Sequence, residues 1–89
     1  MKIKEGFHLR TVAREHVVVA VGNASLVLNG IIKLNESGAL LWNGIMDGLE
    51  EEQLVGLLTR TYGITGDEAK KGVNNFLNTL RGIGCLEEE

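Results

Sequence analysis

The junction between Leu34 and Asn35 divides this sequence into two parts with different hydrophobic patterns. The part before it holds short runs of valine, isoleucine and leucine, which are typical of β-strands. The apolar residues after it recur at helical spacing. No helical segment separates the predicted strands, so a parallel sheet built from crossover helices is excluded. The stretch from Gly30 to Gly38 therefore predicts a strand that runs directly into a helix.

Two segments near the N-terminus predict an antiparallel hairpin. Residues 7–13 alternate in side-chain character, as a half-buried strand does. Residues 16–21 hold four valines, whose branching at Cβ suits a pleated sheet. We expect Arg14–Glu15 to form the turn between these strands and Gly22–Asn23 to end the second one.

The last predicted strand covers residues 31–34 and follows a strong hairpin signal, Asn29–Gly30. Residues 25–28 form another short apolar run just before that signal. The pattern leaves two alternatives open. The sheet has three strands, or four if residues 25–28 pair across Asn29–Gly30.

Three amphipathic segments follow, each with recognisable ends. Asn35 is the predicted N-cap of the first helix, which ends at Asp47–Gly48. The second helix is expected from Glu50 to Tyr62, and the third begins at a capping box formed by residues 65–68. Gly63, Gly82 and Gly84 mark helix ends. The side chains expected to face the core are Leu41, Trp42, Ile45 and Met46, then Leu54, Leu57, Leu58 and Tyr62, and finally Ala69, Val73, Phe76, Leu77, Leu80 and Ile83.

These elements predict an α+β, winged-helix-like fold: a small N-terminal antiparallel sheet of three or four strands followed by three α-helices. A chain of 89 residues holds one core, so we expect a single domain over residues 1–89. One cysteine permits no internal disulfide, which fits a reducing compartment. There is neither a signal-peptide pattern nor an apolar run of about 20 residues that would span a bilayer. We therefore expect a cytoplasmic protein without a membrane partner.

The sequence offers no constellation suited to catalysis. His8, His16 and the distant Cys85 do not have the spacing of a metal site. Cys85 is expected to be a small buried apolar residue, since the acidic residues near it would not favour a thiolate. Neither a phosphate-binding glycine loop nor a nucleophile–base pair is present. We expect no enzyme activity and no cofactor.

One block of the sequence resembles a known family. Residues 34–42, Leu-Asn-Glu-Ser-Gly-Ala-Leu-Leu-Trp, followed by Asp47–Gly48, resemble the PqqD family, whose strand ends in Leu-Asn before a helix that closes on Asp-Gly. The resemblance covers roughly residues 7–86. It implies a non-catalytic peptide-recognition element that holds the leader of a ribosomally made precursor peptide for a modifying enzyme, which is a radical-SAM protein in the PQQ pathway. Residues 22–29 and Gly72 differ from the PQQ-pathway pattern, which favours another peptide-maturation pathway.

The resemblance also implies a binding surface. An extended peptide would add a strand to the edge formed by Gly30, Ile31, Ile32, Lys33 and Leu34. The wall of the groove would be the third helix, where Lys70, Asn74, Leu77 and Arg81 fall on one face. The alternative is that these polar side chains are simply solvated.

Two other possibilities remain open from the sequence. A winged-helix DNA-binding domain would have a similar fold, but a net charge of −3 makes a nucleic-acid partner unexpected. A homodimer formed by exchange of the N-terminal hairpin is also compatible with the pattern.

Overall fold

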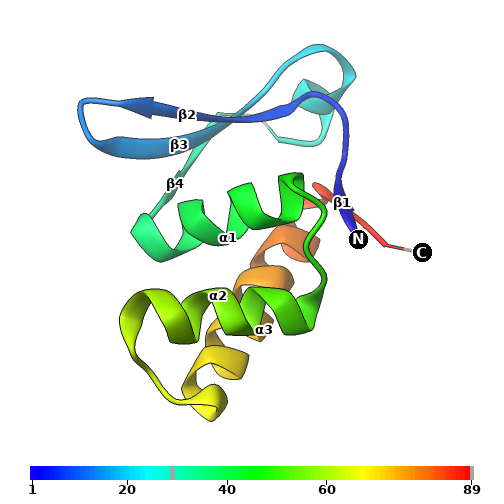
Figure 1. The fold of residues 1–89 in the computed structure, drawn as a ribbon. Coiled ribbons are helices and arrows are strands. Elements are labelled where there is room, and N and C mark those ends of the chain that lie inside the picture. The colour runs from blue at the N-terminus through cyan, green and yellow to red at the C-terminus, as the bar shows by residue number, and fades with distance from the viewer. Residues whose placement is uncertain (29, 89) are drawn as a thin grey trace.

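A computed structural model describes residues 1–28 and 30–88 of the chain. A small sheet covers one side of the molecule and the helices lie on the other side (Figure 1). The described strands are β1 (Lys2–Ile3), β2 (Phe7–Val12), β3 (Glu15–Ala20), β4 (Ile31–Leu34) and β5 (Leu86–Glu87). The helices are η1 (Gly22–Leu26), α1 (Glu36–Met46), α2 (Glu51–Tyr62) and α3 (Gly66–Ile83).

The main sheet has three antiparallel strands in the order β2-β3-β4. The expected α+β architecture, with the sheet before the three α-helices, is therefore confirmed. The alternative strand at residues 25–28 is wrong, because the short 3₁₀ helix η1 occupies the first half of this segment and a turn follows it. The hydroxyl of Ser25 donates to the carbonyl oxygen of Gly22 at 2.7 Å, a local bond that favours a turn over a strand. Asn29, half of the predicted hairpin signal, lies outside the described residues.

The hairpin between β2 and β3 turns one residue earlier than predicted. Val12 pairs with Glu15, so the two-residue loop is Ala13–Arg14 rather than Arg14–Glu15. Ala13 and Arg14 have positive φ values of 52° and 68°. Two-residue loops that match the twist of the strands require positive φ at both positions, even in residues that rarely adopt it. The register of β2 and β3 therefore imposes positive φ values on two residues that seldom adopt them.

A second, two-stranded sheet joins the ends of the described chain. Strand β1 pairs with β5 antiparallel, with Ile3 opposite Leu86. The backbone N–H of Lys4 donates to the carbonyl oxygen of Cys85 at 2.8 Å and extends this pairing. Each strand has two residues, too few to show any hydrophobic period, so this pairing could not be predicted from the sequence pattern.

The helix ends follow the predicted chemistry except at Gly82, which lies inside α3 rather than at its end. The side-chain oxygen of Asn35 accepts a hydrogen bond from the N–H of Gly38 at 2.7 Å, and Thr65 accepts one from Glu68 at 3.1 Å. Gly63 and Gly84 are in the left-handed conformation that ends α2 and α3. Among the described helices, none combines the length and apolarity needed to cross a bilayer.

The core lies where the inner face of the sheet meets the three helices. Trp42 of α1 is buried in the core as predicted: it is 1% exposed and is the largest fully buried side chain among the described residues. Two predicted core residues are wrong: Met46 is 59% exposed and Tyr62 is 45% exposed. Each is the last residue of its helix, where the helix extends beyond its packing partners. The buried core consists of Phe7, Val18, Ala24, Leu41, Trp42, Ile45, Leu54, Leu58, Ala69, Val73, Leu77, Leu80, Cys85 and Leu86.

Candidate functional site

Strand β4 is the outermost strand of the main sheet. It pairs with β3 through residues 31–34, and no other strand of the described chain pairs with its second edge. In an antiparallel ladder, alternate residues direct their N–H and C=O groups toward the neighbouring strand. Half of the backbone groups of β4 therefore point away from β3. Such an edge is a template for a further strand.

The side chains of β4 alternate between the two faces of the sheet. Ile32 and Leu34 pack against the core on the inner face. Ile31 and Lys33 lie on the outer face, where Ile31 is 61% exposed. Lys33 Nζ is 3.5 Å from Glu15 Oε1, and both side chains are largely exposed, so this ion pair contributes little stability. The part of β4 that remains available for binding a further strand is therefore its backbone.

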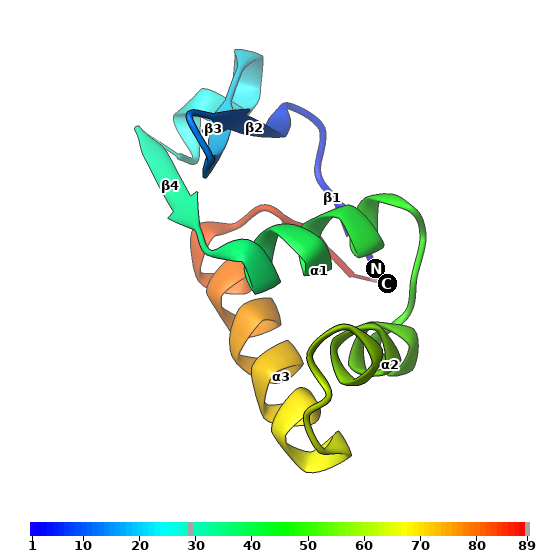
Figure 2. The ribbon, with the colours of Figure 1, turned by 60° about the vertical axis from the view of Figure 1, so that its left-hand side comes forward.

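A hollow of about 270 Å³ lies between the start of α1 and one side of α3. It begins at Asn35, the residue that follows β4. Figure 2 shows β4 and the C-terminal half of α3 on the same side of the molecule, with the start of α1 between them. The residues that line this hollow are Asn35, Ser37, Gly38, Leu41, Leu58, Gly72, Asn75, Phe76 and Thr79.

Gly38 allows the start of α1 to approach α3 closely. A Cβ atom at this position would lie 3.1 Å from Asn35 Oδ1 and 3.4 Å from Cε1 of Phe76. The half-buried ring of Phe76 can therefore lie against the first turn of α1 and form an apolar wall of the hollow. The sequence assigned Phe76 only to the core stripe of α3.

A second hollow, of about 490 Å³, continues from the first. The two share Asn35, Ser37, Leu58 and Gly72 in their linings. Together they form a groove, which we call the α1–α3 groove. It leads from the end of β4 toward the loop between α2 and α3. The residues that line only the second hollow are Glu36, Tyr62, Ile64 and Glu68.

The face of α3 predicted from the sequence does not lie in this groove. Leu77 is 1% exposed and belongs to the core. Lys70 and Asn74 instead line a separate hollow with Glu51, Glu52 and Val55 of α2. The structure thus separates these α3 residues from Gly30–Leu34, which do form the sheet edge and its approach as predicted. Residues 72, 76 and 79 also share one side of the helix at helical spacing, but spacing alone does not say which side meets the sheet edge.

Arg81, the fourth residue of that predicted face, is paired with the C-terminal segment. Its Nε and a terminal nitrogen donate to the two carboxylate oxygens of Glu88 at 3.0 and 2.6 Å, and another donates to Asn78 at 2.8 Å. The hydrogen bond with Arg81 lowers the pKa of Glu88 below its usual value. A two-point contact of this kind orients both side chains. Arg81 is thereby directed away from β4.

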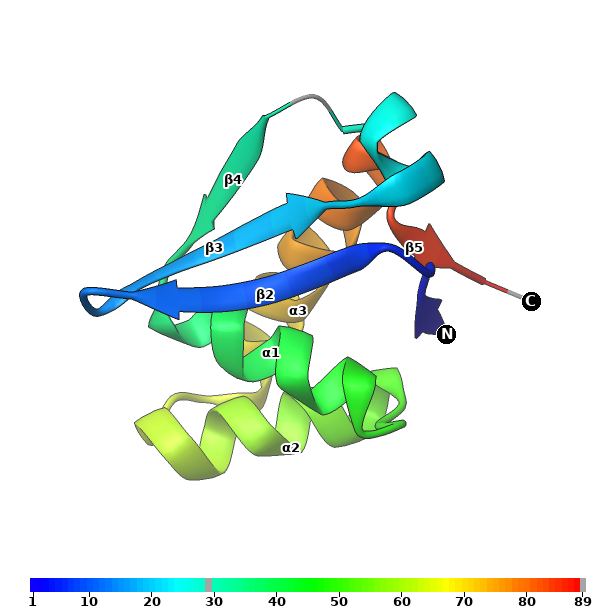
Figure 3. The same ribbon diagram turned by 90° about the horizontal axis from the view of Figure 1, so that it is seen from above.

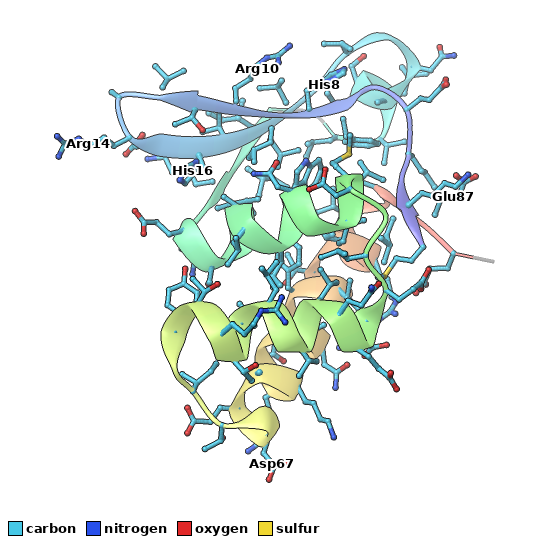
Figure 4. The ribbon with its side chains drawn as sticks, in the orientation of Figure 1. His8, Arg10, Arg14, His16, Asp67 and Glu87 are labelled. Atoms are coloured by element: carbon cyan, nitrogen blue, oxygen red, sulfur yellow. The ribbon has the colours of Figure 1, made fainter. Side chains whose placement is uncertain are left out.

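The histidines and the cysteine do not assemble a reactive centre. His16 Nδ1 is 2.8 Å from the hydroxyl oxygen of Thr11 and lies on the helix side of the sheet, whereas His8 belongs to the opposite face (Figure 4). Cys85 is fully buried, and this burial raises the pKa of its thiol. Over residues 1–28 and 30–88, no three His, Cys, Asp or Glu side chains are placed to hold a metal ion.

Comparison with known proteins identifies a family and a fold. The family model described as coenzyme PQQ synthesis protein D (PqqD) matches residues 15–86. The structure of TbiB1 in complex with the TbiA(beta) leader peptide superimposes with a TM-score of 0.83 at 19% identity, over 100% of this chain and 98% of that one. The lasso peptide synthetase B1 complexed with the leader peptide gives a TM-score of 0.80 at 16% identity, over 98% and 96%. Among curated proteins, none matches the sequence.

Proposed function

The chain belongs to the PqqD family, and from this premise we propose that it is a non-catalytic module that binds the leader of a ribosomally synthesised precursor peptide. It presents the precursor to a peptide-modifying enzyme, of the radical-SAM type or another, in the PQQ pathway or another maturation pathway. We further propose that it acts in the cytoplasm as one domain over residues 1–89. The two similar solved structures hold leader peptides, which supports this function.

The single observation that carries the proposal is the open edge of β4. An extended peptide can add to this edge as a fourth strand and form backbone hydrogen bonds with the outward-pointing groups of residues 31–34. These bonds do not depend on the peptide's side chains. They explain how a module of this kind holds a leader in an extended conformation.

Backbone pairing alone gives too little affinity. About four added hydrogen bonds contribute roughly 1 kcal/mol each, whereas a dissociation constant of 1 μM requires about 8 kcal/mol. Burial of one large apolar side chain adds roughly 1.5–3 kcal/mol. We therefore propose that at least two apolar leader side chains enter the α1–α3 groove, where the half-buried side chains of Phe76 and Ile64 contribute apolar surface.

The groove also suggests a charge preference. Glu36 and Glu68 line its far hollow, and none of the described lining residues there is basic. A basic leader residue is accordingly expected over this end of the groove. This differs from the acidic leader that a contact with Lys70 and Arg81 would have favoured.

A pair of α3 variants tests the proposed site. Thr79→Arg places a large side chain in the groove, and the matched control Asn74→Arg places the same side chain on the α2 side of α3. Both sites are exposed, and Arg has the higher helix propensity, so folding is expected to be preserved. In titration calorimetry with a leader peptide that the original protein binds, we expect Thr79→Arg to weaken binding at least tenfold. Asn74→Arg should stay within twofold of the original protein.

The opposite result would place the site elsewhere. If Asn74→Arg weakens binding and Thr79→Arg does not, the peptide lies along the face predicted from sequence, with Lys70, Asn74 and Arg81. If neither variant changes the affinity, α3 is not part of the site. Circular dichroism of both variants excludes unfolding as the cause.

The DNA-binding alternative gains no support. The matched family and both solved structures concern peptide-related proteins. The helical part of the sequence is acidic, with ten acidic and four basic residues over positions 36–89. A strongly acidic helical part would repel the phosphate backbone.

A further inference from the structure

The outer face of the main sheet combines an apolar strip with basic side chains. The register places His8 opposite Val19 and Arg10 opposite Val17, then Val19 opposite Ile31 and Val17 opposite Lys33. These residues all lie on the face opposite Phe7 and Val18, which are buried on the inner side. We call this set, with Val12 and Glu15, the outer sheet face. Its centre is therefore aliphatic, and its margins carry His8, Arg10 and Lys33 together with Glu15, whose carboxylate is 3.5 Å from Lys33 Nζ.

Nothing in the described chain covers the outer sheet face. Seen from above, none of the three α-helices lies in front of β2, β3 or β4, and β2 and β3 cross over parts of α1 and α3 (Figure 3). Arg10 extends outward from β2 on the side away from the helices (Figure 4). Val12 is 66% exposed and Ile31 61% exposed. Val21, Leu26 and Val27, at the end where β3 leads through η1 toward β4, are exposed as well.

The charges of the chain are divided between its two parts. Residues 1–35 contain five basic and two acidic side chains, a net charge of +3, whereas residues 36–89 carry a net charge of −6. Lys2 and Lys4 lie on and next to β1, outside the main sheet. Residues 7–34, which include the main sheet, contain Arg10, Arg14 and Lys33 against Glu15, so this part of the chain has a net charge of +2. Complementary potentials steer partners and fix their orientation.

We infer that the outer sheet face is the docking surface for the peptide-modifying enzyme, which would present an apolar strip with an acidic margin. This inference rests on the proposed function, because a module that presents a peptide must contact the peptide and the enzyme at once. The β4 edge and the α1–α3 groove are taken by the leader. The outer sheet face shares β4 with that site, so an enzyme docked there lies beside the bound peptide.

The dimensions of the outer sheet face fit a weak, reversible contact. Three strands spaced by about 4.8 Å and six residues at about 3.3 Å each give a face of roughly 300 Å². Interfaces below about 1,200 Å² in total are typical of transient complexes. A second copy of this chain is the competing occupant, since its acidic helical side is complementary in charge. That contact would be head-to-tail, so it would produce rings or open chains rather than a two-fold symmetric dimer.

Two variants on β2 and β3 and one control test this inference. Arg10→Glu reverses the charge of the margin, and Val19→Thr removes apolar surface while keeping a side chain branched at Cβ. Arg60→Glu makes the same charge change on α2, at the other end of the molecule (Figure 1). The probe is a purified peptide-modifying enzyme that binds the original protein, immobilised for binding measurements. Leader affinity is measured in parallel by calorimetry.

We expect Arg10→Glu to lower enzyme affinity at least tenfold, mainly through slower association, and Val19→Thr to lower it about threefold. Arg60→Glu should leave it within twofold, and leader affinity should stay within twofold in all three variants. Enzyme affinity that is unchanged in Arg10→Glu and Val19→Thr, with normal leader binding, overturns this inference alone. A leader that fails to bind the original protein overturns the proposed function and this inference together. Light scattering that shows chain-length growth of the original protein, abolished by Arg10→Glu, assigns the outer sheet face to a second copy instead.

Discussion

If the leader peptide adds to β4 as a strand, then its own backbone must alternate between bonded and free N–H groups. Replacing single amides of the leader by esters removes one N–H donor at a time and leaves the side chains in place. Within the segment that pairs with residues 31–34, esters at alternate positions should weaken binding, and esters at the positions between them should not.

The expected size follows from the length of the edge. Strand β4 has four residues, and alternate residues face outward, so about two leader N–H groups find acceptors there. Each lost hydrogen bond costs about 1 kcal/mol, which is about fivefold in the dissociation constant. Two esters of the bonded class should together weaken binding about 25-fold. The same two substitutions at the other class should change it by less than twofold.

Titration calorimetry of the unmodified leader and of both classes of ester peptide provides the measurement. Equal effects of both classes of ester, or no effect of either, would refute strand addition at β4 even if the leader binds tightly. In that case the affinity would come from side chains in the α1–α3 groove alone. The ester series therefore distinguishes a peptide paired with the sheet from one that lies on the helices.

Three further outcomes concern the protein itself. Asn35→Ala removes the acceptor for the N–H of Gly38. The free energy of unfolding should fall by about 1 kcal/mol, and thermal unfolding should show a Tm lower by roughly 4–8 °C. An unchanged Tm would refute the role of Asn35 as a cap. Gly44→Ala should also lower Tm, because the new Cβ would lie 2.8 Å from Cδ2 of Leu54. Overpacking of this kind costs roughly 1–3 kcal/mol of stability, which exceeds the gain of about 1 kcal/mol from the higher helix propensity of alanine. A raised Tm would contradict this expectation. The Cys85 side chain is fully buried, and this burial also raises the pKa of its thiol. A disulfide reagent at pH 8 should therefore modify the folded protein only after the protein opens, whereas the unfolded chain in guanidinium reacts at once; rapid labelling of the folded protein would mean that the thiol is accessible.

The parts of the fold that were predicted correctly depend on neighbours in the sequence. The caps at Asn35 and Thr65 and the helix ends at Gly63 and Gly84 each involve residues no more than five positions apart. The valine-rich strand and the amphipathic stripe of α3 are equally local patterns. The open edge of β4 could also be anticipated, because no apolar segment after it has the character of a long strand.

The tertiary structure decided the features that depend on distant segments. The pairing of β1 with β5 joins the ends of the described chain, and the register of β2 with β3 moved the hairpin turn to Ala13–Arg14. Both arise from contacts that no short window of sequence contains.

The sequence by itself determined that α3 has a buried stripe, but not how the rest of its surface is divided. Val73, Leu77 and Leu80 are buried as their spacing requires. Whether Thr79 or Asn74 faces the end of β4 depends on how α3 is rotated against α1 and α2, and the close approach of Phe76 to Gly38 defines that side. The helical spacing of apolar residues shows which residues lie on either side of the buried stripe, but it does not show which side faces β4. Only the packing of α3 against the other elements determines that.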